Sequence, residues 1–128
     1  MSINRYQNGK IYAIKSPETK MVYIGSTCGN LRNRLSKHKS NLKSYLNGNY
    51  CYTTSYEIVK YNNSYIELLE NHSCNTKEEL NRREGQIMRA TENCVNKYII
   101  GRRTEEYKQQ FVRDIEDILI QRRTRYNV

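Results

Sequence analysis

The amino-acid sequence predicts an α+β fold: a small, mainly antiparallel three-stranded sheet flanked by helices, with an extra C-terminal helix. Three short runs rich in β-branched and aromatic residues, at 10–15, 20–25 and 64–70, are typical of strands. The segments between and after them carry the apolar period of helices. Strands and helices do not alternate strictly, which favours the α+β class. Because 128 residues suit one domain, we expect a single domain over 1–128, with a core of about 9–97.

The first two strands are expected to form an antiparallel hairpin. The runs KIYAIK (10–15) and KMVYIG (20–25) are separated by SPET, in which Pro17 fits the first corner of a turn. Two strands joined by so short a connection pair antiparallel. Residues 1–8 are polar, and no regular structure is expected there.

A long helix is expected after the hairpin. Asn30 is a favourable N-cap, and Gly48 lies just past the expected end. Leucines spaced to form one helical stripe lie between them, at Leu31, Leu35, Leu42 and Leu46. A short helix near 54–60 is favoured over a strand, and the third strand follows at 64–70.

Two further helices are expected in the last third of the chain. Thr76 and Glu79 have the spacing of a capping box, so a helix should run from Thr76 to about Thr91. The segment 94–103 is expected to be a loop or a short extended piece. The last helix, about 104–123, has acidic residues in its first turn and arginines in its last, which suits the helix dipole. Its apolar stripe consists of Tyr107, Phe111, Ile115 and Leu119.

One residue of the helix beginning at Thr76 breaks the apolar pattern. Leu80, Ile87 and Met88 share a face with Glu84, so a carboxylate lies in a stripe that should face the core. A buried carboxylate is costly unless it is paired or binds a cation. The ordinary explanation is an ion pair with a neighbouring arginine (82 or 83) or with a basic residue of another helix.

The charge balance favours a polyanionic partner. The chain has 22 basic and 13 acidic residues, a net charge of +9 and a pI of about 9.5. Nucleic acid is therefore the favoured partner, although such a charge can also serve solubility alone. No segment pairs a basic face with a strongly apolar one, so no membrane partner is expected. Four cysteines without a CxxC pair, and no signal peptide or transmembrane run, indicate an intracellular, reducing compartment.

Basic residues gather on the long helix after the hairpin. Arg34 and His38 are four residues apart, so they share a face beside the leucine stripe. Further cations on the same helix are Arg32, Lys37, Lys39 and Lys43. A charge run of this kind is most often a solvated face, and a histidine beside an apolar stripe is more often packed than functional.

Several of these residues also match a known family in order and spacing. The pair KIYAI and VYIGST, with Tyr12 and Tyr23 eleven apart, resembles the motif that names the GIY-YIG nuclease family, with Lys10 in place of the first glycine. The family places an arginine about ten residues after the second tyrosine, often with a histidine one turn later. Arg34 and His38 fit those places.

The resemblance continues to about residue 96. The family places a glutamate in a later helix and an asparagine after it, and Glu84 in RREGQIM and Asn96 in ENCVNK match. The pattern looks most like the compact stand-alone, homing-endonuclease-like members of phages and large DNA viruses. A viral chain of this kind would act inside the host cell.

The resemblance implies a divalent-metal-dependent endonuclease that hydrolyses DNA, double-stranded or branched. One Mg²⁺ or Mn²⁺ would be held by Glu84, and Arg34 would neutralise the scissile phosphate. Tyr12 is favoured as the general base and Tyr23 as the partner that orients water or phosphate, but the two roles are open to exchange. The remaining roles are a proton relay or phosphate contact for His38, and for Asn96 the ordering of the site or of the metal-bound water.

Substrate contacts are expected from a larger set. Gly25 would allow a close approach of the substrate, and basic side chains would hold flanking phosphates. The set comprises Gly25, Ser26, Arg32, Lys37, Lys39 and Lys43, with Arg102 and Arg103 as further candidates.

Two alternatives remain open. The first is a non-catalytic nucleic-acid-binding module with the same fold, for which an inward glutamate would have no purpose. The second concerns the last helix, whose stripe would either pair two copies of the chain or pack on its own sheet. Packing on its own sheet, and therefore a monomer, is favoured.

Overall fold

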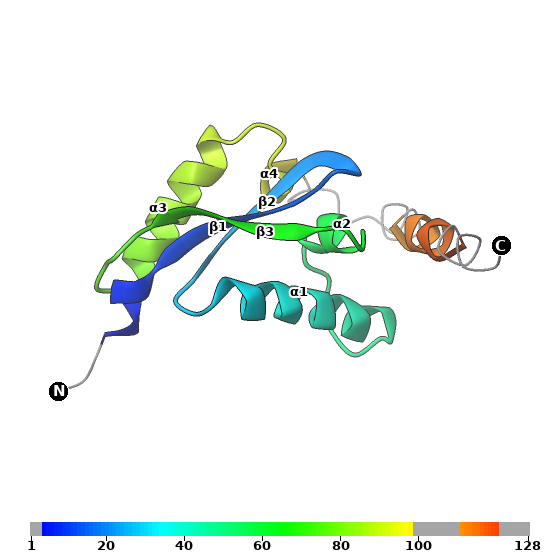
Figure 1. Cartoon of the computed structure of the whole chain (residues 1–128), viewed down its shortest axis with the longest axis horizontal. Coiled ribbons are helices and arrows are strands. Elements are labelled where there is room, and N and C mark those ends of the chain that lie inside the picture. Colours follow the sequence, from blue (N-terminus) through cyan, green and yellow to red (C-terminus); the bar gives the residue numbers. More distant parts are fainter. Residues whose placement is uncertain (1–3, 99–110, 121–128) are drawn as a thin grey trace.

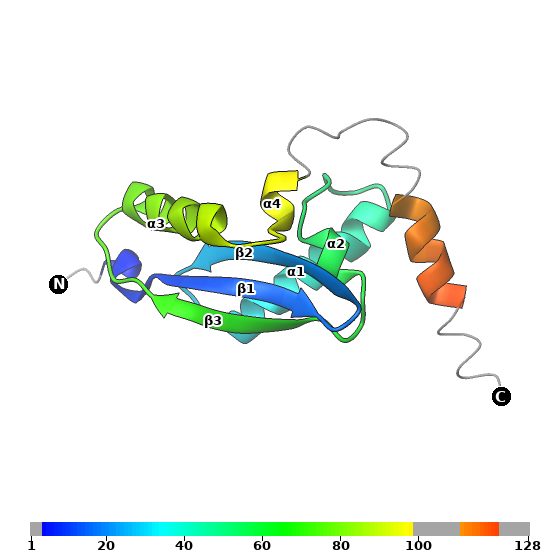
Figure 2. The ribbon, with the colours of Figure 1, turned by 90° about the horizontal axis from the view of Figure 1, so that it is seen from above.

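Three strands form the central sheet, in the order β2-β1-β3, with helices on both faces (Figures 1 and 2). The computed structural model describes residues 4–98 and 111–120. Its named elements are the 3₁₀ helix η1 Arg5–Asn8, strands β1 Lys10–Ser16, β2 Thr19–Thr27 and β3 Tyr65–Asn71, and helices α1 Leu31–Leu46, α2 Tyr56–Val59, α3 Lys77–Ala90 and α4 Val95–Tyr98. Residues 111–120 form a further helix. The expected α+β fold is confirmed.

The register of the sheet decides which side chains meet which helices. β1 pairs antiparallel with both neighbours, and Tyr12 lies opposite Gly25, as Ile14 lies opposite Tyr23. Directly opposed residues point to the same face, so these four positions share one face. Tyr12 and Ile14 pack there with residues of α1, α2 and the helix at 111–120. The alternate residues Ile11, Ala13 and Ile24 pack on the other face with α3.

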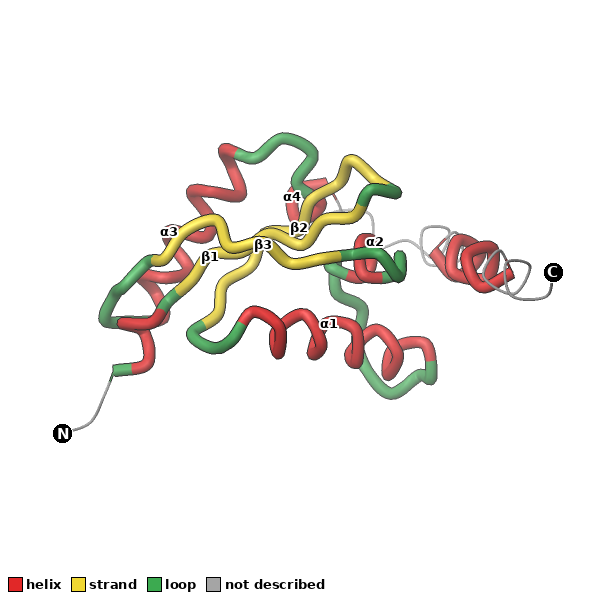
Figure 3. The backbone as a smooth tube through the Cα atoms, viewed as in Figure 1, coloured by secondary structure: helices red, strands yellow, loops and turns green. Residues whose placement is uncertain are grey.

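The caps predicted for the two long helices are present. Asn30 Oδ1 accepts a hydrogen bond from Asn33 N at 3.2 Å at the start of α1. Gly48 ends the turn after α1 with φ of +81°, a left-handed conformation that glycine adopts at little cost. Thr76 Oγ1 accepts from Glu79 N at 3.2 Å at the start of α3. The short helix expected near 54–60 is α2 (Figure 3).

Two predictions of irregular structure were wrong. Residues 5–8 form η1, because the side chain of Asn4 accepts a hydrogen bond from Tyr6 N and Tyr6 packs against the α3 core. The segment expected to be loop or extended contains α4, which begins at the buried Val95. Cys94, just before it, forms a parallel bridge with Val22 of β2.

The C-terminal helix uses its apolar stripe within the chain. Phe111 is 2% exposed and Ile115 8% exposed, and both belong to the core on the α1 face. Leu119, in contrast, is 46% exposed. Tyr107 and the remainder of the expected helix outside 111–120 lie beyond the described residues. No described helix has the length and apolar character needed to cross a membrane.

Candidate active site

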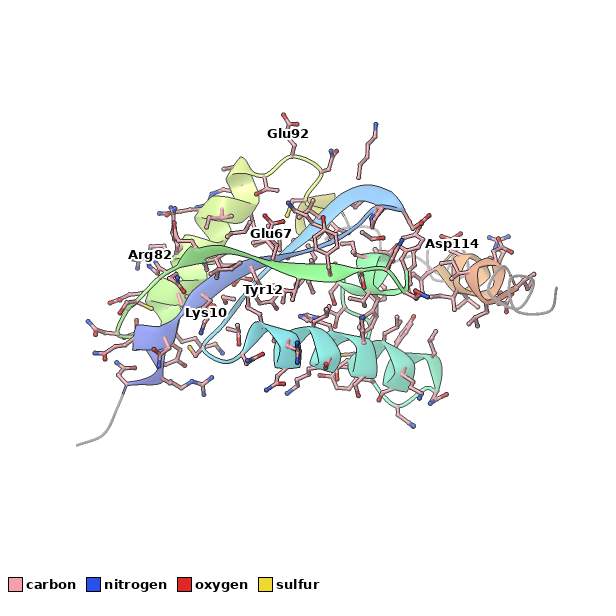
Figure 4. All side chains as sticks on the ribbon, viewed as in Figure 1. Lys10, Tyr12, Glu67, Arg82, Glu92 and Asp114 are labelled. Atoms are coloured by element: carbon pink, nitrogen blue, oxygen red, sulfur yellow. The ribbon has the colours of Figure 1, made fainter. Side chains whose placement is uncertain are left out.

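A buried tyrosine lies at the centre of the predicted site. Tyr12 projects from the middle strand into the space between the sheet and α1 (Figure 4) and has no exposed surface. Its Oη lies 2.9 Å from His38 Nε2 and accepts a hydrogen bond from Arg34 Nε at 3.1 Å. Burial raises the pKa of the Tyr12 phenol, and the hydrogen bond from Arg34 partly opposes this. Three predicted residues from β1 and α1 therefore meet at one oxygen.

The histidine of this group is neutral at pH 7. His38 is 4% exposed, and its burial together with the Arg34 charge lowers its pKa from 6.5 to about 4. Its second ring nitrogen, Nδ1, lies 2.8 Å from Ser55 Oγ, just before α2. Sequence reasoning did not select Ser55, because it belongs to no recognised motif and lies within the short helix expected near 54–60. His38 thus has hydrogen-bond partners at both nitrogens.

The glycine of the YIG motif makes room for the tyrosine ring. A Cβ on Gly25 would lie 2.9 Å from Tyr12 Cε2, and nearer still to Cζ and Oη. These contacts are shorter than real Cβ atoms make, so a side chain here would displace the ring. The sequence suggested that Gly25 serves a close approach of substrate; in the structure, it is the phenol of Tyr12 that approaches Gly25.

The second motif tyrosine lies beside the first but is partly exposed. The ring centroids of Tyr12 and Tyr23 are 6.4 Å apart, and Tyr23 lies 5.2 Å from the His38 ring, edge to face. Burial raises the pKa of Tyr23, as do Tyr12 and Glu84 nearby. Within the described ranges its hydroxyl has no hydrogen-bond partner, so it is available to water or substrate.

The carboxylate that broke the apolar pattern approaches the same site from the other helical layer. Glu84 on α3 is half-buried, and its Oε2 accepts a hydrogen bond from Ser26 Oγ at 3.1 Å. Burial raises the pKa of Glu84, while the Ser26 hydroxyl and the Arg34 charge oppose the rise. Because β2 is an edge strand, groups from both sheet faces can meet beside it. Glu84 and Arg34 come from opposite faces, and each is near enough for its charge to affect the pKa of the other.

The ordinary explanation of Glu84, an ion pair, has no support in the described residues. Arg83 instead forms two hydrogen bonds with Glu70 of β3, at 2.7 Å each, and a third with Gln86. Arg82 is exposed on α3, which lies across the sheet from Tyr12 (Figure 4). Among residues 4–98 and 111–120, no cation lies within ion-pairing distance of Glu84, although Arg34 is near enough to affect its pKa.

The predicted asparagine lies at the free edge of β2. Asn96 Oδ1 accepts from Ile24 N at 3.1 Å, and its Nδ2 donates to Ile24 O at 3.0 Å. Cys94 Sγ also donates to Oδ1, at 3.3 Å. The amide is therefore engaged by the strand that carries Tyr23 and Gly25, which agrees with an ordering role.

The predicted phosphate-binding residues of α1 do not all share the Arg34 side. Lys37 lies one turn from Arg34 on the same side of the helix. At 3.6 residues per turn, the other three are displaced from Arg34 by roughly 140–180° around the axis. These three displaced residues are Arg32, Lys39 and Lys43. All four side chains, including that of Lys37, are exposed. Lys39 lines a cavity of about 250 Å³ between α1, α2 and the helix at 111–120. Arg102 and Arg103 lie outside the described residues.

The donor set suits a metal that needs few protein ligands. Within residues 4–98 and 111–120, no three His, Cys, Asp or Glu side chains gather as a metal cluster. Glu84 offers a carboxylate without an ion pair there, with only the Ser26 hydroxyl on one oxygen. Mg²⁺ commonly binds through one or two carboxylates and retains several waters. The residues therefore fit a single, largely hydrated ion, and would not form an all-protein cage.

An α+β domain that directs a guanidinium, two phenols and a carboxylate to one sheet edge is suited to phosphate chemistry. A family model described as GIY-YIG catalytic domain matches residues 8–99, most of the chain, so this chain belongs to the GIY-YIG family. Members of the family are nucleases that act on DNA, and they generally depend on a divalent metal. Comparison with curated proteins and with solved structures gave no match.

Proposed function

We propose that this chain is a divalent-metal-dependent endonuclease that hydrolyses DNA phosphodiester bonds. One observation carries the proposal: Arg34 and His38 both hydrogen-bond to Tyr12 Oη, while Glu84 lies across the β2 edge without an ion pair among the described residues. A binding module would gain nothing from a half-buried carboxylate whose pKa is raised by burial. This arrangement favours catalysis over binding alone.

Arg34 holds the scissile phosphate. Tyr12 accepts from Nε and so fixes the plane of the guanidinium, and the two Nη groups make no hydrogen bond within the described ranges. A guanidinium with both Nη groups available can donate to two oxygens of one phosphate. Lys37, on the same side of α1, adds charge for a flanking phosphate.

Tyr12 receives the proton of the attacking water. A neutral phenol becomes a base if it passes its own proton on, and His38 Nε2 lies 2.9 Å away to take it. The Arg34 Nε–H occupies only one lone pair of Oη, so the phenol oxygen can still accept the proton of the water. The water oxygen then bonds to phosphorus as the bond to the leaving oxygen breaks. Tyr23, whose side chain is partly exposed, orients the water or the phosphate.

Glu84 is the residue that would hold the divalent ion, Mg²⁺ or Mn²⁺. A bound ion of this kind acts as a Lewis acid on the phosphate and the leaving oxygen. Ser26 fixes the carboxylate by donating to Oε2, and the nearby Arg34 charge favours its ionised form. Both effects keep Glu84 available as a ligand despite its burial.

The motif pattern supports a finer placement with the stand-alone, homing-endonuclease-like members of phages and large DNA viruses, acting within cells on double-stranded or branched DNA. The burial of Phe111 and Ile115 against the rest of the chain supports a monomer, since these side chains are unavailable to a second copy. A monomer has one site and cuts one strand per encounter.

A supercoiled-plasmid assay with and without EDTA tests the proposal. The parent protein should nick plasmid in Mg²⁺ or Mn²⁺, and EDTA should stop it. Glu84→Gln should lower the rate by about 10²-fold or more, the scale of a lost electrostatic catalytic group. Glu78→Gln is the matched control, because Glu78 is an exposed carboxylate on the same helix. Equal cleavage by E84Q and E78Q, or DNA binding by the parent without cleavage, would overturn the proposal.

A further inference from the structure

Ser55 lies at the N-cap position of α2 but does not cap the helix. Ser55 is the N-cap of α2, yet its side chain makes no capping hydrogen bond, and its backbone is already helical with φ −60° and ψ −23°. An N-cap serine ordinarily stabilises its helix by about 1 kcal/mol through such a bond. Ser55 Oγ instead lies 2.8 Å from His38 Nδ1 on α1, and the serine has no exposed surface.

The hydrogen bonds from Arg34 through Tyr12 and His38 to Ser55 all run the same way, each group donating to the next. Arg34 Nε can only donate, so Tyr12 Oη accepts from it. A phenol is a better donor and a poorer acceptor than an aliphatic hydroxyl, and accepting one bond strengthens its donation. Tyr12 therefore donates to His38 Nε2. In a neutral imidazole the proton is then on Nδ1, which donates to Ser55 Oγ.

We propose that Ser55 is a positioning residue of the catalytic network: by accepting the Nδ1 proton of His38, it keeps Nε2 as the acceptor that Tyr12 needs. The role rests on the proposed function, in which Tyr12 passes its proton to that nitrogen. Without an acceptor at Nδ1, the imidazole would place its proton on Nε2 part of the time. It would then compete with Arg34 as a second donor to Tyr12.

The loss of the capping bond at Ser55 and the burial of its hydroxyl cost stability, which supports a role for the contact with His38. Ser55 forgoes a capping bond and remains fully buried, while the ring that it holds is 96% buried and neutral, with its pKa lowered to about 4. The next residue, Tyr56, is buried in the core, where it packs against the rings of Tyr45 and Tyr52. That packing fixes the position of Ser55 independently of His38.

Two variants and one control separate this role from a general packing effect. Ser55→Ala removes the acceptor and Ser55→Thr retains it. Ser64→Ala is the matched control, because Ser64 is also buried and its hydroxyl has no partner in the described part of the chain. S55A should lower kcat by about 10- to 100-fold, part of the 10²–10⁴ that proton transfer contributes, and leave KM within about threefold. S55T should recover kcat to within about threefold of the parent, and S64A should match the parent.

A spectroscopic readout tests the inference independently of cleavage. The chain has two histidines, so long-range ¹H–¹⁵N spectra of the imidazoles can be assigned with a His72→Gln variant. At pH 7 the parent His38 should carry its proton on Nδ1, and S55A should show a population protonated on Nε2. An Nε2–H tautomer in the parent overturns the inference, as does S55A cleaving at the S64A rate.

The two proposals fail in distinguishable ways. If the parent cleaves no DNA under any metal condition, the proposed function fails, while the tautomer of His38 in the parent still decides what Ser55 does. If S55A does not fold, the parent spectrum and the kcat of S55T decide the question, with an S55T rate as low as E84Q counting against the inference.

Discussion

The side chain of Asn96 forms two hydrogen bonds with the backbone of Ile24, one to its N–H and one to its C=O. β2 is an edge strand, so the amide occupies a place that a fourth strand would take. Tyr23 and Gly25 flank Ile24, and Gly25 supports the ring of Tyr12. A contact outside the reacting groups therefore fixes the strand on which both motif tyrosines depend.

Replacement of Asn96 should cost stability before it affects chemistry. Asn96→Ala should lower the free energy of unfolding by about 1–3 kcal/mol, because two partly buried backbone groups lose a partner. Asn96→Asp should be at least as destabilising at pH 7, since a carboxylate cannot donate to Ile24 O. Urea unfolding followed by circular dichroism measures both. Asn81→Asp, an exposed change of the same kind on α3, is the control. An N96D variant of parental stability that no longer cleaves would indicate a chemical role instead.

The two motif tyrosines should differ in what their loss changes. Tyr12→Phe removes the proton relay and the acceptor that orients Arg34, so kcat should fall by about 10²–10⁴-fold. Tyr23→Phe leaves the contact between Tyr12 and His38 intact, so it should lower kcat less, by about tenfold. Single-turnover cleavage of a labelled duplex measures both. A larger loss for Y23F than for Y12F would exchange the two roles, in agreement with the greater exposure of Tyr23.

The fold was predictable because local signals agreed with one another. Apolar periodicity located the strands and long helices, and the caps at Asn30 and Thr76 set where two helices begin. The candidate site followed from a motif whose members keep their order along the chain. In the structure four of the six catalytic candidates, Tyr12, Tyr23, Arg34 and His38, are joined by hydrogen bonds and ring contacts, and Glu84 is near enough to affect the pKa values of the first three. These features depend on neighbours in sequence or on a known pattern.

What could not be predicted depends on contacts between distant segments. Ser55 and His38 meet only because α2 packs on α1, and Arg83 pairs with Glu70 because β3 lies near α3. The β1–β2 register also shifts near the turn, where Ser16 pairs with Thr19. If that register continued, Tyr12 would oppose Tyr23, and only the shift places Gly25 beneath the Tyr12 ring.

That register makes Gly25 a sensitive test of the site. In Gly25→Ala the new Cβ would overlap the Tyr12 phenol, so the ring must move away from Arg34 and His38. Overpacking of this kind costs about 1–3 kcal/mol of stability, and cleavage should fall by about as much as in Y12F. Gly29→Ala is the matched control, because its nearest neighbour would be Thr27 Oγ1 at 3.8 Å. Full activity in G25A would show that Tyr12 tolerates displacement.

The buried histidine predicts how stability should depend on pH. The unfolded chain protonates His38 near pH 6.5 and the folded chain only near pH 4, so the unfolded state binds more protons between these values. Stability from this residue is therefore complete above pH 6.5 and is lost as the pH falls toward 4. The loss should reach about 2 kcal/mol at pH 5. Glu84 has the opposite effect on stability: because its pKa is raised on folding, its contribution favours the folded state more as the pH falls.

Comparison of variants isolates the histidine from the other groups. Urea unfolding at pH 7 and pH 5 should give the parent a difference of about 2 kcal/mol that His38→Gln lacks, whatever the absolute stability of that variant. His72→Gln should retain the difference, because His72 lies outside the core. Its Nδ1 is 3.5 Å from Oε2 of Glu70, the last but one residue of β3. If H38Q loses as much stability as the parent between pH 7 and pH 5, His38 does not remain neutral in the folded protein. The proton relay from Tyr12 would then have no acceptor.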